Sequence, residues 1–314
     1  MLRQPLLLVL FLVWAGLANP YAAAAEPTFP QGLRVGLTPP ADAKLSAQFP
    51  GFADAGRQVT ITILDLPGAA YPSLEAAVFG KELQGLADMK RESFPFASGI
   101  GFLVSGRVQA KGVTAYKWLL LATASGEPVQ DLTTLITVTV PEAAYAVYTD
   151  AAIRKALASV TFRPAPVEEQ LGLLPFKFGD RAGFRPLKVL PSGVVILTDG
   201  PTDNLNSQPY MIVSVGRGAP PESAERGRFA RDLVERAPLA GLRVQSAEPM
   251  RVMGSPGYEV RATAKSSDGA ALSLVQWLRF GPNGFLQIVG VARSDGWDAL
   301  FPRFRAVRDG LGVR

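Results

Sequence analysis

One segment of this chain gathers the side chains best suited to bind a metal ion. Carboxylate and amide oxygens recur in Asp199–Asn206, whose sequence is DGPTDNLN, and such oxygens are the usual ligands of calcium. The EF-hand spacing is absent, and no closing glutamate follows. Asp, Asn, Gly and Pro are also the commonest turn formers. We therefore expect a turn here, and the sequence predicts no metal-binding, cofactor-binding or catalytic residue.

Two tyrosines, Tyr116 and Tyr258, each lie four positions after a glycine and lead into a strand-like run that ends Ala-Thr-Ala. If the chain contains two copies of one domain, the two rings could line a pocket in each copy. The simpler interpretation is that each ring packs at a strand entrance and its hydroxyl bonds to the turn. Trp118 and Trp277 also lie in strand-like runs, and we expect them in the core or on a sheet face rather than as stacking platforms.

The absence of two residue types excludes most catalytic chemistry. The chain has no histidine and no cysteine, which removes the Ser-His-Asp triad, the imidazole base, thiolate chemistry and iron–sulfur clusters. No Ser-x-x-Lys, Gly-x-Ser-x-Gly or phosphate-binding glycine loop is present. Carboxylate chemistry survives in principle, but the separation of two carboxylates cannot be read from sequence. The sequence thus favours a protein that is not an enzyme.

Positive charge gathers in the second half without forming a nucleic-acid site. Residues 165–314 hold 19 basic and 15 acidic residues, whereas residues 26–164 hold 12 of each. One predicted helix carries Arg226, Arg228, Arg231 and Arg236. Arginine pairs recognise carboxylate or phosphate, but a solvated helix face is the simpler interpretation. An excess this small and this spread out argues against nucleic-acid binding.

The elements that hold these residues follow the same order twice. In the first half we expect strands at 33–37, 44–49 and 59–66, a helix from Ser73 to about Leu86, strands at 100–104, 116–122, 133–140 and 144–148, and a helix capped by Thr149. In the second half we expect strands at 184–190, 194–198 and 210–215 and a helix from Ser223 to Arg236. Strands at 258–264, 272–279 and 285–291 and a helix opened by Ser294 or Asp295 complete the second half.

Hairpin-linked strands with helices outside them indicate an α+β fold, with an antiparallel sheet covered by helices, built twice in tandem. The order of elements resembles the PsbP-like fold, through Gly112-x-x-x-Tyr116 and through the closing helix that runs into 158–164, ASVTFRP. The second copy is similar at Gly254-x-x-x-Tyr258, but its end, 307–311, departs from that pattern. Proteins with this fold are largely exported, non-enzymatic accessory proteins, many of unknown role, so the resemblance implies a fold more than a function.

The first 25 residues have the three-part pattern of a signal peptide. Arg3 precedes an apolar run, and Ala23, Ala24 and Ala25 offer a cleavage site. Asn19-Pro20 interrupts the run before the ~20 residues needed to span a membrane. We expect 1–25 to be cleaved, which leaves a periplasmic protein with no stable membrane insertion.

We expect 26–164 to be the first domain and 165–314 the second, with 163–166, RPAP, as a short linker. A wide surface made of two domains favours a protein partner in the periplasm or cell envelope. A carrier of small molecules or lipids and a carboxylate-dependent enzyme remain alternatives. The first needs a sizeable apolar pocket, and the second needs acidic side chains that converge in a cleft.

Overall fold

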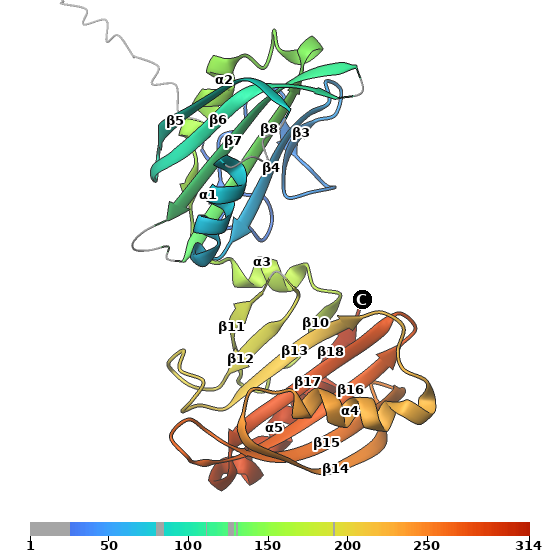
Figure 1. Ribbon diagram of the computed structural model, residues 1–314. Helices are drawn as coiled ribbons and strands as arrows, with labels where there is room; N and C mark the ends of the chain where they lie inside the picture. The colour runs from blue at the N-terminus through green and yellow to red at the C-terminus, as the bar shows by residue number, and fades with distance from the viewer. Residues whose placement is uncertain (1–25, 80–84, 111, 125–128, 130, 191) are drawn as a thin grey trace, which may run out of the picture.

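The computed structural model of the chain describes residues 26–79, 85–110, 112–124, 129, 131–190 and 192–314. The expected signal peptide, residues 1–25, lies outside the described residues. Figure 1 shows two sheet-based bodies that follow one another along the chain, with α3 (Val167–Gly172) between them. Within the described residues, no helix is both long and apolar enough to cross a membrane.

The first body is built on an antiparallel sheet of seven strands in the order β2-β3-β4-β8-β7-β6-β5. These strands are β2 (Lys44–Leu45), β3 (Gly51–Asp54), β4 (Val59–Leu66), β5 (Leu86–Phe96), β6 (Gly99–Ala110), β7 (Val113–Ala124) and β8 (Leu132–Pro141). A separate antiparallel pair joins β1 (Val35–Gly36) to β9 (Thr161–Phe162).

The second body repeats that plan, with the order β11-β12-β13-β17-β16-β15-β14. Its strands are β11 (Arg185–Val189), β12 (Val195–Thr198), β13 (Tyr210–Arg217), β14 (Ala240–Val252), β15 (Ser255–Lys265), β16 (Ala271–Gly281) and β17 (Gly284–Arg293). The separate pair joins β10 (Phe176–Phe178) to β18 (Leu311–Val313). Adding nine to each strand number of the first body reproduces the second, so the chain consists of two tandem copies of one α+β fold.

Each sheet buries one face under the helix that closes its copy. Val59, Ile61 and Ile63 alternate along β4 and are all buried, as expected of a strand with one face on the core. That face packs against Ile153 and Leu157 of α2 (Asp150–Ala158). In the second copy, Phe304 and Val307 of α5 (Trp297–Asp309) occupy the same place. The 3.6-residue period of both helices puts these side chains on one side.

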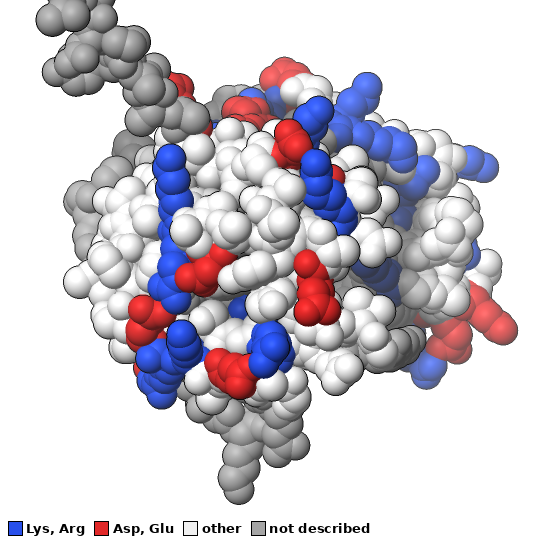
Figure 2. Space-filling model, turned by 90° about the horizontal axis from the view of Figure 1, so that it is seen from above, with Lys and Arg blue, Asp and Glu red and all other residues white. Residues whose placement is uncertain are grey.

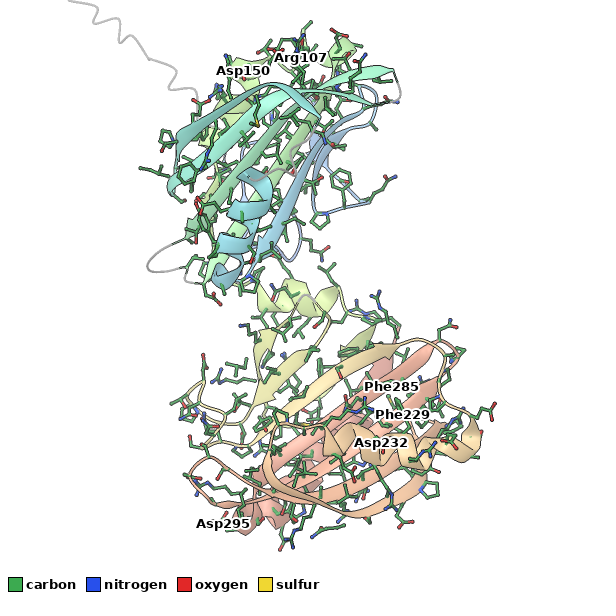
Figure 3. The ribbon with its side chains drawn as sticks, in the orientation of Figure 1. Arg107, Asp150, Phe229, Asp232, Phe285 and Asp295 are labelled. Carbon is green, nitrogen blue, oxygen red and sulfur yellow. The ribbon has the colours of Figure 1, made fainter. Side chains whose placement is uncertain are left out.

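A second helix in each copy follows the fourth strand and lies on the other face. This helix is α1 (Tyr71–Phe79) in the first copy and α4 (Arg226–Glu235) in the second. Ala230 and Val234 of α4 bury a separate apolar cluster with β15 and β16. In Figure 3, Phe229 of α4 lies close to Phe285 of β17, and their rings meet edge to face at 5.1 Å between centroids. The second sheet is therefore covered on both faces.

Several elements differ from those expected. The first helix ends at Phe79 rather than near Leu86, because Leu86 already begins β5. The strand expected at 144–148 is wrong: a short 3-10 helix, Glu142–Ala144, is followed by a turn that leads Tyr148 into the core. Two long edge strands, β5 and β14, were not expected at all. Most of their side chains face solvent, so they lack the apolar alternation that identifies a strand.

The segment expected to be a plain linker leads directly into α3. Pro166 precedes this helix, and Leu171 is buried in the core of the second copy. The other side of α3 contacts the first copy at Gly32: Glu169 Oε2 accepts the Gly32 amide at 2.9 Å, and Gln170 Nε2 donates to the Gly32 carbonyl at 3.0 Å. Arg163 reinforces the junction with two bonds to the Glu169 carboxylate, at 2.7 and 2.8 Å. The short helix therefore fixes one copy to the other.

Candidate binding site

The polar loop Asp199–Asn206 folds into a turn, and its carboxylates point to different arginines. Asp199 receives two bonds from Arg303 of α5, at 2.6 and 2.8 Å, and Asp203 receives one from Arg185 of β11, at 2.9 Å. Within the described part of the chain, no group of three or more Asp or Glu side chains is arranged to hold a metal ion. The loop's oxygens serve its own architecture.

The two tyrosines of the Gly-x-x-x-Tyr motif do not occupy equivalent positions. Tyr116 lies on β7, the seventh strand of its copy, whereas Tyr258 lies on β15, the sixth strand of the other. Each motif marks the entry to a hairpin strand, since Gly112 and Gly254 have φ of 78° and 75°, conformations that favour glycine. The motif identified the hairpin entries correctly, but it paired two different hairpins.

Both tyrosine rings pack against neighbouring residues. Tyr116 stacks on Tyr145 with 4.0 Å between ring centroids. The ring of Tyr258 lies against α4 at Gly227, where an added Cβ would come within 3.2 Å of it. Both rings are packed, as the simpler interpretation expected, but neither hydroxyl has a hydrogen-bond partner within the described residues, so the expected bond to the turn is absent there.

The tryptophans are the true structural equivalents, on β7 and β16, and both are buried. Trp118 Nε1 donates to Asp150 Oδ1 at 2.8 Å, and Trp277 Nε1 donates to Glu259 Oε2 at 2.7 Å. The acceptor comes from helix α2 in the first copy and from the neighbouring strand β15 in the second. Both indoles are core residues, as expected, and each buried N–H has a carboxylate partner.

The arginines of α4 do not converge on a common point. Arg226 lies over the ring of Phe280 at 4.9 Å and donates to the Pro221 carbonyl, while Arg228 pairs with Glu225. Figure 2 views the molecule from the end of the first copy and shows acidic and basic side chains interspersed there. The separate partners of Arg226 and Arg228 favour a solvated helix face with local contacts.

An open groove at one end of the second sheet is the best candidate site, and we name it the end groove. Its volume is about 250 Å³. It is lined by Leu205, Asn206, Gln208, Tyr210, Pro238, Leu239, Ala240, Lys265, Ser266, Ser267, Leu272, Val291, Ala292 and Arg293. These residues come from the 199–209 loop, the segment after α4, the β15–β16 turn, and strands β13, β14, β15, β16 and β17.

The loop wall of the end groove is rigid because its polar groups bond to one another. Gln208 reaches across the loop, accepts the Thr202 amide at 3.1 Å, and donates to the carbonyls of Thr202 and Asn204 at 2.9 and 3.0 Å. Arg185 adds bonds to the carbonyls of Gly200 and Thr202. A wall braced in this way presents Leu205 in a fixed position, which lowers the ordering cost of binding.

The opposite wall is the β15–β16 turn, and Asp268 organises it. The Asp268 carboxylate accepts bonds from the Ser266 hydroxyl, the Ala270 amide and Arg293 of β17. The Ser266 hydroxyl contributes most, and together these donors hold the pKa of Asp268 below its ordinary value. Arg293 lines the groove but is already paired with this carboxylate.

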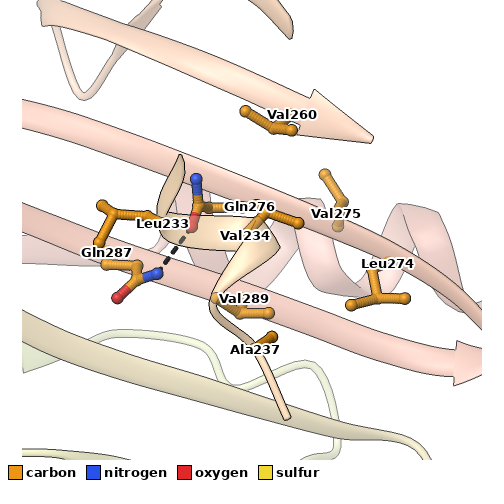
Figure 4. Close-up of a pocket in the computed structure, with 9 residues that line it drawn as sticks. All are labelled: Leu233, Val234, Ala237, Val260, Leu274, Val275, Gln276, Gln287 and Val289. Atoms are coloured by element: carbon orange, nitrogen blue, oxygen red, sulfur yellow. Dashed lines mark hydrogen bonds between the residues drawn. The ribbon is translucent and has the colours of Figure 1, made fainter. Parts of the chain in front are cut away.

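A second, smaller cavity of about 40 Å³ lies under α4 (Figure 4). Gln287 Nε2 donates to Gln276 Oε1 at 2.6 Å across its wall, and Gln276 donates to the Ala230 carbonyl at 2.9 Å. Its space corresponds to little more than one water at ~30 Å³ each. This cavity belongs to the packing of α4 rather than to a ligand site.

Sequence reasoning did not identify the end groove. Its lining residues are spread over residues 205–293 and come from eight segments, so no local motif marks them. The only signal was the polar loop, which the sequence analysis correctly treated as a turn. The loop forms one wall of the groove because of the strand order in the sheet, and this order cannot be read from the sequence.

No known protein family and no curated protein matches the chain by sequence. Solved structures do match. LpqN of Mycobacterium tuberculosis, described as involved in cell envelope biogenesis, is 12% identical over 44% of this chain and 82% of its own, with a TM-score of 0.38. PsbP of the cyanobacterium Synechocystis sp. PCC 6803 is 16% identical over 45% of this chain and 87% of its own, with a TM-score of 0.33.

A third similar structure extends over nearly the whole chain. The immunity protein TplEi of the T6SS of Pseudomonas aeruginosa is 12% identical over 92% of this chain and 97% of its own, with a TM-score of 0.29. LpqN and PsbP each match about half of the chain. The resemblance to the PsbP-like fold that the sequence predicted is confirmed, and it concerns the fold alone.

Proposed function

We propose that this protein is an exported binding protein that works without catalysis and contacts a protein partner in the periplasm or cell envelope through the end groove. The observation that supports this proposal most is the groove itself, open to solvent and held between two walls braced by internal hydrogen bonds. Preformed concave sites of this kind favour ligand binding. The signal-peptide pattern of residues 1–25 supports export.

The carboxylates of the described residues support a non-catalytic role. Two carboxylates converge at Arg57, where Asp42 and Asp54 both accept bonds from Nη1, at 3.0 and 2.8 Å. Arg57 and the hydroxyl of Tyr148 hold the pKa of Asp54 below its ordinary value. A carboxylate kept ionised and bonded by two donors is suited to bracing the fold rather than to donating a proton.

The carrier alternative finds less support in the cavities. The two cavities described here measure about 40 and 250 Å³, below the range of about 300–1,000 Å³ typical of sites that enclose a drug-sized ligand. The larger one is open and partly polar. A groove of that size suits one or two side chains of a partner better than a lipid.

Affinity capture from the envelope fraction tests the proposal. The full chain is compared with Ser267→Trp, which places a bulky ring at the mouth of the groove from an exposed turn position. We expect a partner that the unaltered protein captures and the variant captures poorly. Turnover by the purified protein in a broad hydrolase screen, lost when a carboxylate is replaced, would contradict the proposal.

A further inference from the structure

One buried donor in the second copy has no acceptor among the described residues. Of the buried side-chain nitrogens and oxygens that the structure describes, Arg279 Nε of β16 alone lacks a hydrogen-bond partner. The rest of the Arg279 guanidinium also forms no hydrogen bond or ion pair with a described residue. Buried polar groups in folded proteins are bonded to the protein, to water or to a ligand. We therefore expect an acceptor from outside the chain at Arg279.

The strand register puts a second arginine on the same face of the sheet. Arg279 is opposite Leu286 of β17, and Leu286 is opposite Val215 of β13. Leu286 and Val215 belong to the core beneath α5, and directly opposed residues share a face, so Arg279 is on the α5 side. Arg217 is two residues after Val215 along β13, so the alternation of the strand puts it on that side too. Arg217 is exposed and has no hydrogen-bond or ion-pair partner within the described residues.

Two glycines separate the two arginines. Arg217 is opposite Gly284, and Gly284 is opposite Gly281. Since neighbouring strands lie about 4.8 Å apart, Arg217 and Gly281 are about 10 Å apart across the sheet. Arg279 extends toward this row, because its Nη1 would be 3.8 Å from a Cβ added to Gly281. The two glycines have no side chains to cover the backbone between the arginines, so a ligand can approach it closely.

Carboxylates on the same face are bonded to other groups. Glu259 is opposite Trp277 and accepts bonds from the Trp277 indole and the Arg261 guanidinium. Asp309 of α5 is bonded to Arg308, whose guanidinium lies 4.8 Å from the centroid of the Trp277 ring. These two carboxylates do not neutralise the arginines beside the glycines. The positive charge there remains available, and the complementary ligand is an anion.

We propose that Arg217, Arg279, Gly281 and Gly284 form a phosphate-binding site, which we name the arginine-pair site. A guanidinium binds two oxygens of one anion through parallel bonds. The two oxygens of a carboxylate lie in one plane and match one guanidinium, whereas the three terminal oxygens of a phosphate monoester point in different directions and can meet two. The site is at the opposite end of β13 from the end groove, so it goes beyond the proposed function and does not depend on it.

Calorimetric titration of the purified full chain with glycerol phosphate tests the assignment, and acetate at the same ionic strength is the carboxylate comparison. We expect glycerol phosphate to bind about tenfold more tightly than acetate, since the second arginine adds charge-assisted bonds. A soluble phosphate monoester and the headgroup of phosphatidic acid share this chemistry. Cosedimentation with phosphatidylcholine vesicles that contain or lack phosphatidic acid distinguishes them: vesicle binding that depends on phosphatidic acid assigns the site to a lipid, and its absence assigns it to a soluble phosphate.

Variants of the arginine-pair site locate the binding. Arg279→Met and Arg217→Met should each weaken the binding of glycerol phosphate about tenfold, because charge-assisted bonds are lost. Arg279→Lys keeps the charge without the parallel donors and should recover only part of the affinity.

Gly281→Val should also weaken binding, because its side chain covers the backbone between the arginines. The fold has room for the added Cβ, whose nearest neighbours would be 3.6 and 3.8 Å away. Arg243→Met is the matched control: it removes an exposed arginine near the start of β14, and we expect it to change nothing.

Thermal unfolding separates a ligand-binding role of Arg279 from a structural one. Without phosphate, Arg279→Met should unfold at the same temperature as the unaltered protein or higher, because no bond within the chain is lost and a buried donor without an acceptor is removed. Glycerol phosphate should raise the unfolding temperature of the unaltered protein and leave that of Arg279→Met unchanged.

Four results would overturn the assignment. The first three are equal binding of glycerol phosphate and acetate, unchanged binding in Arg279→Met or Gly281→Val, and no binding of either glycerol phosphate or the phosphatidic acid vesicles. The fourth is a clear fall in the unfolding temperature of Arg279→Met without phosphate, since Arg279 would then have a partner within the chain.

Discussion

At the scale of single residues, Tyr148 shows how a buried polar group of the first copy finds its partner. Its side chain is fully buried, and its hydroxyl donates to Asp54 Oδ2 at 2.8 Å. Arg57 donates to the same oxygen from the β3–β4 hairpin. Burial and the bond to Asp54 raise the pKa of Tyr148 to about 12. The neutral hydroxyl thus joins the strand end to the turn before α2.

We expect Tyr148→Phe to lower the free energy of unfolding by about 1 kcal/mol, because Asp54 loses one donor. The raised pKa adds a pH dependence: the contribution is complete below the ordinary tyrosine pKa near 10 and declines as the pH rises toward 12. Urea unfolding at pH 8 and pH 11.5 should show a smaller difference between the two proteins at the higher pH. Tyr145→Phe is the control, since the Tyr145 hydroxyl has no hydrogen-bond partner within the described residues.

Glu259 supports the buried tryptophan of the second copy in the same way. Its carboxylate accepts the Trp277 indole at 2.7 Å and the Arg261 guanidinium at 2.8 Å, and its side chain is only 20% exposed. Glu259→Ala leaves the indole N–H without an acceptor, and we expect a loss of about 1–3 kcal/mol in denaturant unfolding. Glu248→Ala, directly across on the exposed edge strand β14, should be near neutral. Equal effects of the two substitutions would contradict this account.

At the scale of elements, the helix boundaries show which local signals the sequence carries. Thr149 was expected to cap the closing helix of the first copy, and its hydroxyl accepts the Ala152 amide at 3.3 Å. Ser223 was expected to cap the helix after β13, but it opens a 3-10 turn and makes no capping bond. The sequence could not distinguish these two positions, because an N-cap bond depends on the direction in which the chain enters the helix.

The two serine/threonine positions form a matched pair for experiment. Thr149→Ala should lower the free energy of unfolding by about 1 kcal/mol, the typical value of an N-cap bond. Ser223→Ala should leave it unchanged, since no capping bond is lost. Urea unfolding at neutral pH measures both. A comparable loss in Ser223→Ala would show that its hydroxyl bonds to α4 in solution.

Burial explains which elements could be predicted from the sequence and which could not. Strands with one face in the core, such as β4 and β13, alternate visibly and were predicted close to their true bounds. The edge strands β5 and β14 expose most side chains and were missed. Helix α3 was missed because two prolines precede it, which is typical of a linker. The end groove stayed hidden because its walls meet only after the sheet has formed.

At the scale of the whole molecule, duplication of the topology did not preserve each residue's neighbours. The carboxylate that holds the core tryptophan moved from α2 in the first copy to β15 in the second. In the first turn of the closing helix, the i,i+4 pair is an ion pair between Asp150 and Arg154 in α2, and a stack of Trp297 on Phe301, with 5.5 Å between ring centroids, in α5. The two copies therefore stabilise the same topology with different side-chain contacts, which allows their surfaces to have different functions.

The junction between the copies depends on one carboxylate. The Glu169 carboxylate of α3 accepts bonds from Arg163 and from the Gly32 amide. These two donors, of which Arg163 has the larger effect, hold the pKa of Glu169 below its ordinary value near 4.5. We propose that the copies meet at residues 164–165, next to this bond network. Because the pKa is lower in the folded protein, the contribution of Glu169 is complete above about pH 4.5 and is lost as the pH falls through the lowered value.

We therefore expect Glu169→Gln to loosen the junction at neutral pH without unfolding either copy, because the charge-assisted bonds to Arg163 are weakened while both cores stay intact. Small-angle X-ray scattering should show a larger radius of gyration in this variant, and circular dichroism should be unchanged. Glu168→Gln is the matched control on the same helix, since the Glu168 side chain is 73% exposed and, within the described residues, pairs with Arg181 alone. If the two variants scatter alike at pH 7, the copies are held by apolar contact of α3 rather than by the Glu169 carboxylate. In that case lowering the pH toward 4 should also leave the scattering of the unaltered protein unchanged.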